Sequence, residues 1–153
     1  MAKIKALTCF DIADYFLTLP DEEVGDSISN LKLQKLVYYA QGFHLAIFDK
    51  PLFNETIEAW THGPVIPDLY QKYKVNGYKP IERPDKVDFN KYSSDVQELL
   101  NDVWNVYGQY SAWRLRDLAH EEIPWQRAYK TNTKVIAHKM LREYFITQLE
   151  SYP

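Results

Sequence analysis

The stretch from Leu31 to Phe48 constrains this chain most, because its pattern predicts one long helix with little polar surface. Apolar residues recur there at three- and four-residue steps, which is the spacing of a helix packed on a core. The helix would be about 27 Å long at 1.5 Å per residue, enough to cross a small domain. The apolar stripe consists of Leu33, Leu36, Val37, Ala40, Phe43 and Ile47, and we expect only Lys32, Gln34, Lys35 and Gln41 to face water. The sequence therefore predicts a central core helix that packs on several sides.

Helix-start signals divide the rest of the chain into shorter helices. Thr8 and Asp11 form a capping box, which predicts a first helix that ends before Pro20. Other helix starts are expected at Ser29, Pro67, Ser93 or Ser94, Ser111 and Pro124, and a last helix from Lys134 to Leu149. Alternating apolar and polar residues predict a short strand over 53–60, and a second strand is expected near 78–81. We therefore predict a mainly α fold: one compact helical domain, residues 1–153, around the central core helix, with a small β element.

The composition is that of a globular chain in a reducing compartment. Hydrophobic residues make up 46 % and charged residues 25 % of the 153 residues, so wholesale disorder is not expected. The single cysteine, Cys9, excludes an intrachain disulfide. The chain opens without a charged-then-apolar leader and has no apolar run of roughly 18 residues, so no membrane span is predicted. We therefore expect a cytoplasmic protein with no membrane partner.

The residue types that carry catalysis or bind metals are present, but not at the spacing that such chemistry needs. The four histidines lie far apart, and none has a second ligand at a metal-binding spacing. The five glycines are also dispersed, so no phosphate-binding loop is predicted. Cys9 precedes a helix that could stabilise a thiolate, but a buried or capping cysteine explains it better. We therefore predict no metal, no cofactor and no enzymatic activity; a hydrolase site assembled only by the fold is the alternative.

One stretch is basic and contains aromatic residues. Five cations and no acidic residue occur between Ile123 and Arg142. The five are Arg127, Lys130, Lys134, Lys139 and Arg142. Cations beside aromatic rings are typical of sites that hold single-stranded nucleic acid. The net charge of −3 argues against a general nucleic-acid binder, and a solvated basic face or a dock for an acidic protein is the alternative.

Two further stretches present aromatic residues on rigid backbone. In the first, Glu58 to Pro67, a glycine and two prolines fix the chain, and the second, Leu115 to Trp125, ends in a similar Pro-Trp corner. Such corners often only seal the edge of a core; alternatively, the two corners flank one recognition surface. The residues of this interaction or architectural cluster are Trp60, His62, Gly63, Pro64, His120 and Trp125, and Tyr38, Tyr39 and the basic last helix are candidate contact surface.

The same motifs resemble the Panacea antitoxin domain, a family first catalogued as phage-associated proteins that includes SocA-like antitoxins. The resemblance starts at Ile12-Ala13 with Phe16, and continues through Leu31-x-Leu33-Gln34-Lys35-Leu36-Val37-Tyr38-Tyr39-Ala40-Gln41-Gly42. It also includes Glu58-Ala59-Trp60, Gly63-Pro64-Val65 and Pro67, and later Leu115, Leu118, His120, Pro124 and Trp125. These motifs occur in order between about residues 10 and 148.

The resemblance implies a small, mostly helical domain with a minor β element that neutralises a cognate protein toxin by direct binding. Members of the family are typically encoded beside their toxin, and the toxins are diverse, so the resemblance names no particular partner. It also implies an alternative, in which the protein delivers its partner to protease machinery as an adaptor. A phage or prophage regulatory module that binds nucleic acid through residues 130–142 is a second alternative.

Overall fold

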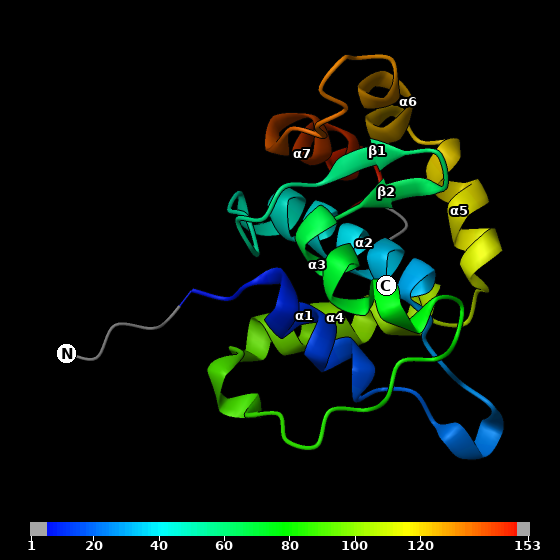
Figure 1. The fold of residues 1–153 in the computed structure, drawn as a ribbon. Coiled ribbons are helices and arrows are strands. Elements are labelled where there is room, and N and C mark those ends of the chain that lie inside the picture. Colours follow the sequence, from blue (N-terminus) through cyan, green and yellow to red (C-terminus); the bar gives the residue numbers. More distant parts are fainter. Residues whose placement is uncertain (1–5, 150–153) are drawn as a thin grey trace.

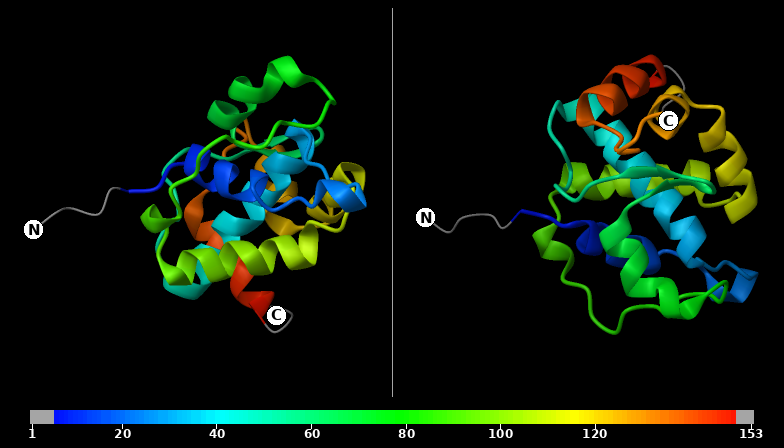
Figure 2. Two further views of the ribbon diagram at one scale, coloured as in Figure 1. Left: turned by 90° about the horizontal axis from the view of Figure 1, so that it is seen from below. Right: turned by 45° about the horizontal axis from the view of Figure 1, so that its top comes forward.

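The structure is a computed structural model, and it describes residues 6–149. Helix α2 (Asn30–Phe48) runs through the middle of the molecule, and the other elements surround it (Figures 1 and 2). Helices α1 (Cys9–Leu17), α4 (Ser94–Tyr107) and α7 (His138–Thr147) all pack against α2. The central helix predicted from the sequence is therefore confirmed.

A β hairpin and the remaining helices complete the layer around α2. These elements are β1 (Glu58–Trp60), β2 (Gly63–Val65), α3 (Pro67–Tyr73), α5 (Ala112–His120) and α6 (Ile123–Tyr129), with 3₁₀ helices at Glu22–Val24, Lys74–Asn76 and Phe89–Lys91. The two strands are antiparallel, and Trp60 lies opposite Gly63. Because β2 and α5 both contact α2 and each other, the two aromatic corners predicted from the sequence meet on one side of the central helix. The fold is mainly helical with a small β element, as predicted.

The helix starts agree with the capping signals in the sequence. Thr8 Oγ1 accepts a hydrogen bond from the Asp11 N–H, and the Asp11 carboxylate accepts one from the Thr8 N–H, so the capping box is confirmed. Ser29, Ser93 and Ser111 each accept a hydrogen bond from the backbone N–H three residues further on. Pro67 and Pro124 lie in the first turns of α3 and α6.

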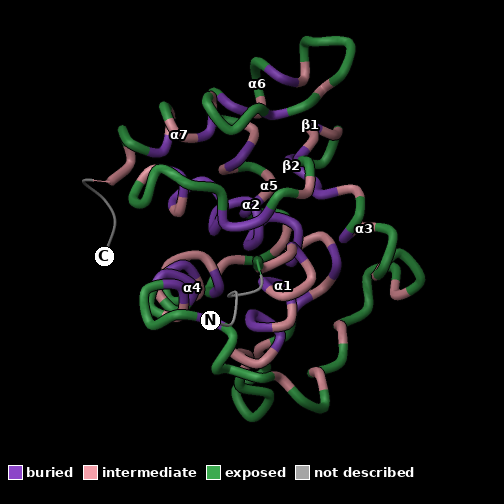
Figure 3. Tube along the Cα trace, turned by 90° about the vertical axis from the view of Figure 1, so that its left-hand side faces the viewer, coloured by how far each residue is buried: buried purple, intermediate pink, exposed green. Residues whose placement is uncertain are grey.

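The core is densest where α7 crosses α2. An added methyl group on Gly42 would overlap the ring of Phe145, so this glycine lets the two helices approach closely. The Phe145 ring also meets those of Phe43 and Tyr38, with centroids 4.9 and 5.6 Å apart. Figure 3 shows buried positions gathered along α2 and exposed positions in the outer loops. All residues of the predicted apolar stripe are buried except Ile47, which lies in the last turn of α2 and is 39 % exposed.

Three polar residues of α2 contradict the sequence prediction most clearly. Gln34, Lys35 and Gln41 were expected to face water, yet all three are 0 % exposed. Gln34 Oε1 accepts a hydrogen bond from the Ile66 N–H at 2.9 Å, and Lys35 Nζ donates one to the Pro64 carbonyl at 3.3 Å. Elements cover α2 on all sides, and its buried polar groups are therefore paired with the backbone of neighbouring segments.

Of the strand predicted over 53–60, only the last three residues, Glu58–Trp60, form a strand. Gln41 Oε1 accepts a hydrogen bond from the Leu52 N–H at 2.6 Å, and Gln41 Nε2 donates one to the Phe53 carbonyl at 2.7 Å. The Gln41 amide thus binds the backbone groups that a partner strand would otherwise pair with. Residues 53–57 are therefore irregular, and β1 begins at Glu58.

Two other boundaries were also wrong. The second strand is Gly63–Val65, while residues 78–81 are turn and coil that share one backbone hydrogen bond with Ile28. The last helix begins at His138 and not at Lys134, because Lys134 has a positive φ of 58° and Val135 forms an antiparallel bridge with Glu58 of β1. The Ala59 N–H donates to the Lys134 carbonyl and the Ile136 N–H to the Ile57 carbonyl, both at 2.8 Å. The β-branched Val135 and Ile136 favour an extended backbone.

A buried carboxyl group joins α2 to the start of α6. Glu122 accepts hydrogen bonds from the Tyr38 hydroxyl at 2.8 Å and from the Tyr39 hydroxyl at 3.0 Å. Both tyrosines are 0 % exposed, so the prediction that they form a contact surface is wrong. Burial raises the pKa of Glu122 to about 7, and the two hydroxyl donors only partly oppose this rise.

This cluster predicts a pH dependence of stability. Because the pKa of Glu122 is about 7 in the folded chain and about 4.5 in the unfolded one, the folded state binds more protons between these values. The free energy of unfolding should therefore fall as pH rises from 4.5 to 7, by at most about 3 kcal/mol from this group. In Glu122→Gln this contribution is absent. Urea denaturation at pH 5 and pH 8 measures it, and an equal loss of stability in both proteins would contradict the assignment.

Candidate functional site

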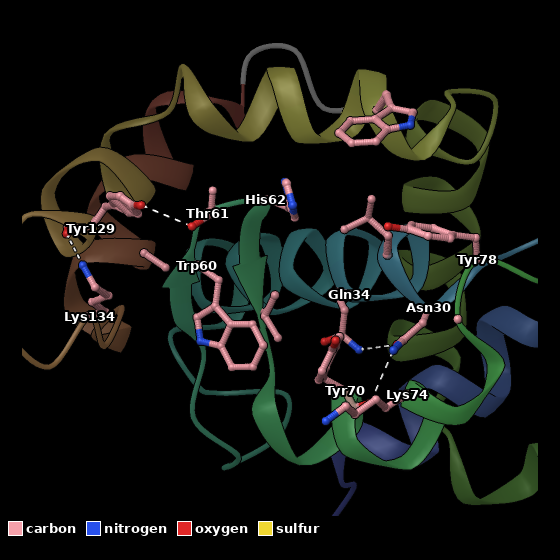
Figure 4. Close-up of a pocket in the computed structure, with 15 residues that line it drawn as sticks. Asn30, Gln34, Trp60, Thr61, His62, Tyr70, Lys74, Tyr78, Tyr129 and Lys134 are labelled. Atoms are coloured by element: carbon pink, nitrogen blue, oxygen red, sulfur yellow. Dashed lines mark hydrogen bonds between the residues drawn. The ribbon is translucent and has the colours of Figure 1, made fainter.

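A groove with a volume of about 810 Å³ opens beside the β hairpin (Figure 4). Its wall includes residues from α2, the hairpin, α3 and the segment after it, α5, the end of α6 and the segment after α6. The lining residues are Asn30, Leu31, Gln34, Ala59, Trp60, Thr61, His62, Val65, Tyr70, Lys74, Gly77, Tyr78, Trp113, Tyr129 and Lys134. Five of them are Trp or Tyr, two are Lys and none is acidic, so the groove is aromatic with a positive bias.

Hydrogen bonds among polar side chains fix the floor of the groove. Gln34 Nε2 donates to Asn30 Oδ1 at 2.9 Å, and Asn30 Nδ2 donates to the Tyr70 carbonyl at 3.3 Å. Gln34 also accepts from the Ile66 N–H, as described above. This chain of bonds ties the end of the hairpin and α3 to α2 (Figure 4). The floor is thus held by buried polar groups whose hydrogen bonds are satisfied by the protein itself.

The rim of the groove exposes aromatic side chains. Trp113 is 53 % exposed and Tyr78 is 89 % exposed. Deeper in the groove, Trp60 and Tyr70 meet edge to face with centroids 5.1 Å apart. Large rings left open to water beside a hollow are typical of a surface that a partner covers.

The hairpin turn is built on Gly63 and a buried lysine. Gly63 has φ 107°, in the left-handed region that favours glycine, and a Cβ atom there would lie 2.7 Å from Lys35 Cε. Lys35 passes beneath the turn and bonds the Pro64 carbonyl. Burial and, to a smaller extent, the nearby charge of Arg116 lower the pKa of Lys35 to about 7. Gly63 and Pro64 are therefore placed behind the groove, where they shape the turn that carries Trp60 and His62.

The second aromatic corner braces the first. Trp125 Nε1 donates a hydrogen bond to the Trp60 carbonyl at 2.8 Å. The Trp125 ring stacks on His120 and on Tyr129, with centroids 4.1 and 4.6 Å apart. Both corners thus lie side by side, but only Trp60 and His62 of the six predicted cluster residues line the groove. Trp125 and His120 support it from behind.

The predicted basic patch is divided by local pairing. Lys134 Nζ bonds the Tyr129 carbonyl at 2.7 Å and lies over the Tyr129 ring, beside the groove. Arg142 forms an ion pair with Asp49 at 2.7 Å, and Lys139 lies 3.9 Å from Glu143. Arg127 and Lys130 are exposed on α6 and just after it. Three of the five cations therefore have partners within the protein, and the stretch is not one continuous basic surface.

Several of the residues that line the groove were not predicted from the sequence. Tyr70, Lys74 and Tyr78 come from a helix and loop without a motif, and only the tertiary structure brings them to the groove. Trp113 had a readable signal, because it lies off the apolar face of α5 that Leu115 and Ala119 define. The burial of Lys35 behind the groove also had a signal in the sequence, since a lysine beside core positions on a helix that is apolar all round is a candidate for burial.

The residues considered for other chemistry are isolated. Burial and the nearby Glu55 carboxylate raise the pKa of the Cys9 thiol to about 12, which leaves it protonated near neutral pH. The His44 ring, partly buried, bonds the Lys50 carbonyl at 2.6 Å. Within residues 6–149, no three His, Cys, Asp or Glu side chains group as metal ligands, and no helix of that part has the length and apolar character to cross a membrane.

The turn at Gly63 makes a testable prediction. Gly63→Ala should cost about 2–4 kcal/mol of stability, because the positive φ is strained with a side chain and the new methyl group meets Lys35. Gly25→Ala is the matched control: it also has a positive φ, 83°, but open space around it, and should cost about 1 kcal/mol. Urea denaturation compares the two. Equal losses would show that Lys35 does not pack against the turn.

Comparisons with known proteins agree with this arrangement. The model of a family described as Antitoxin SocA-like, Panacea domain, matches residues 33–126, more than half of the chain. The matched region contains α2 from Leu33, the hairpin and both aromatic corners. The chain is also 37 % identical over 109 residues to Antitoxin SocA of Caulobacter vibrioides (strain NA1000 / CB15N).

That alignment covers 64 % of this chain and 58 % of Antitoxin SocA, so the match spans less than two thirds of the relative's length. No solved structure matches the chain. The family match alone covers enough of the chain to decide its membership. The chain belongs to the SocA-like antitoxin family defined by the Panacea domain.

Proposed function

We propose that this chain is the antitoxin of a toxin–antitoxin pair and neutralises its cognate protein toxin by direct binding in the aromatic groove. Membership of an antitoxin family supports the role, and the groove beside the hairpin supports the place. The observation that carries the proposal is the pair of exposed aromatic side chains, Tyr78 and Trp113, that line one groove together with Trp60.

The chemistry of the groove suits a protein segment. Trp and Tyr dominate the binding energy of protein interfaces, because they bury a large area and lose little side-chain freedom. The exposed rim rings would be covered by the partner, while the floor has few hydrogen-bonding groups left to offer. A volume of about 810 Å³ would hold several side chains of a docked segment.

In this proposal the protein acts by occupancy and not by chemistry. The Cys9 thiol is buried, with a raised pKa, and lies away from the groove-lining residues. The groove itself contains no nucleophile beside a base. A toxin bound there would be inhibited by a covered active site or a fixed conformation.

We place the complex in the cytoplasm, and we propose that residues 1–153 act as one domain.

Binding by the purified proteins tests the proposal. The probe is the product of the gene adjacent to the one that encodes this chain, expressed alone and with it, then mixed as pure protein. We expect the neighbour to arrest growth alone, to be harmless with this chain, and to form a complex. Trp113→Ala and Tyr78→Ala should each weaken the complex about 30-fold, since truncation of a hot-spot residue costs about 2 kcal/mol or more.

Phe89→Ala is the matched control, because Phe89 is 44 % exposed and does not line the groove. It should leave the complex unchanged. A harmless neighbour, or a toxic one that is rescued without a complex, would refute direct neutralisation of that protein. A complex that tolerates both groove variants would move the binding surface elsewhere.

A further inference from the structure

The basic side chains of Lys35, Arg116 and His120 lie behind the groove, and the described residues offer them few hydrogen-bond partners. Lys35 comes from α2, and Arg116 and His120 lie one turn apart on α5, which packs against α2 and β2. The charges of Lys35 and Arg116 both lower the pKa of His120, although burial lowers it most. The three groups therefore lie within electrostatic reach of one another.

Their hydrogen-bonding capacity is mostly unused within the described residues. Arg116 Nε and His120 Nε2 are buried without a hydrogen-bond partner. Lys35 Nζ can donate three hydrogen bonds, and its one bond, to the Pro64 carbonyl, is 3.3 Å long. Arg116 Nε and Lys35 Nζ are donors, whereas His120 Nε2 donates only in the protonated ring, because the ring already bonds the Thr61 backbone. Buried polar groups are normally paired, so these unused atoms in one place are unusual.

Acidic compensation in the cluster is weak. Asp117 Oδ1 lies 3.7 Å from Arg116 Nη1, but the Asp117 side chain is 58 % exposed. A hydrogen bond with the Thr61 backbone raises the pKa of His120, but by less than burial lowers it. The Arg116 guanidinium carries a positive charge, and Lys35, with a pKa of about 7, is charged in part, so a neighbouring anion would offset charge that the protein compensates only weakly.

The cluster adjoins the proposed toxin-binding groove. The Arg116 guanidinium carbon lies 5.0 Å from the centroid of the Trp113 ring. The His62 ring meets Trp113 edge to face at 5.8 Å, and both His62 and Trp113 are exposed groove residues. The cluster is therefore adjacent to residues that line the groove.

We propose that Lys35, Arg116 and His120 form a carboxylate-binding subsite that takes an acidic group of the bound partner, which rests on the proposed function. A carboxylate accepts up to four hydrogen bonds and matches the planar fork of an arginine. It would accept hydrogen bonds from Arg116 and Lys35, and from His120 in its protonated form, while the rest of the partner segment lies on the aromatic rings. The subsite thus adds a charge requirement to an otherwise aromatic groove.

Titration of the full chain with small anions tests the subsite without any toxin. Ring resonances of His120 are followed by NMR at constant ionic strength and pH. Acetate stands for an acidic side chain, N-acetylglycine for a chain terminus, and inorganic phosphate for an anion that is not a carboxylate. We expect acetate or N-acetylglycine, and not phosphate alone, to shift His120 saturably, while His44 and His138 do not respond. Whichever carboxylate binds more tightly identifies the source.

Two variants on the same helix give the matched comparison. Arg116→Leu should weaken the carboxylate response at least tenfold, and Arg114→Leu, which removes an exposed charge two residues away, should not. The same pair is then measured in the toxin complex, where only Arg116→Leu should weaken binding tenfold. No saturable shift, a response to phosphate alone, or equal effects of the two variants would overturn the subsite.

The anion titration tests the subsite, and the toxin assay tests the proposed function, so either hypothesis can be refuted without the other. Loss of the anion response with toxin binding intact would leave the proposed function standing and remove the subsite. An anion response without a toxin complex would overturn the proposed function alone.

Discussion

The buried polar side chains of α2 are the constraint on which the rest of the structure depends. Gln34, Lys35 and Gln41 are fully buried on a helix that other elements surround, so each must be paired within the protein. Each is paired with the backbone of a neighbouring segment: Gln34 with Ile66, Lys35 with Pro64 of β2, and Gln41 with Leu52 and Phe53. The central helix therefore positions the hairpin and its flanks as well as providing the core.

The groove follows from these anchors. The Gln34 and Lys35 bonds place the hairpin against α2, and Trp125 holds the outer side of the hairpin through the Trp60 carbonyl. Trp60, His62 and Tyr78 are then presented around one groove (Figure 4). Trp113 of α5 also lines it. The residues of the two corners divide by position: Trp60 and His62 line the groove, and Gly63, Pro64, His120 and Trp125 do not.

Much of this fold could be read from the sequence because its signals are local. The serine caps, the capping box at Thr8 and the prolines that start α3 and α6 act on neighbouring residues, and they placed the helices correctly. The failures share another cause. Gln41 replaces a partner strand, residues 134–136 pair with β1, and Tyr38 and Tyr39 bond Glu122. Each depends on a residue far away in the chain, so sequence signals identified the two corners but not the groove.

Hydrogen exchange at two backbone amides tests the anchoring role of α2 most directly. The Ile66 and Leu52 N–H groups lie outside regular secondary structure and donate only to the buried oxygens of Gln34 and Gln41. If these side chains hold the surrounding segments, both amides will exchange as slowly as the amides of α2, through global unfolding. Exchange at the rate of exposed loop amides would contradict the account, because the hairpin and its flanks would then open independently of the central helix.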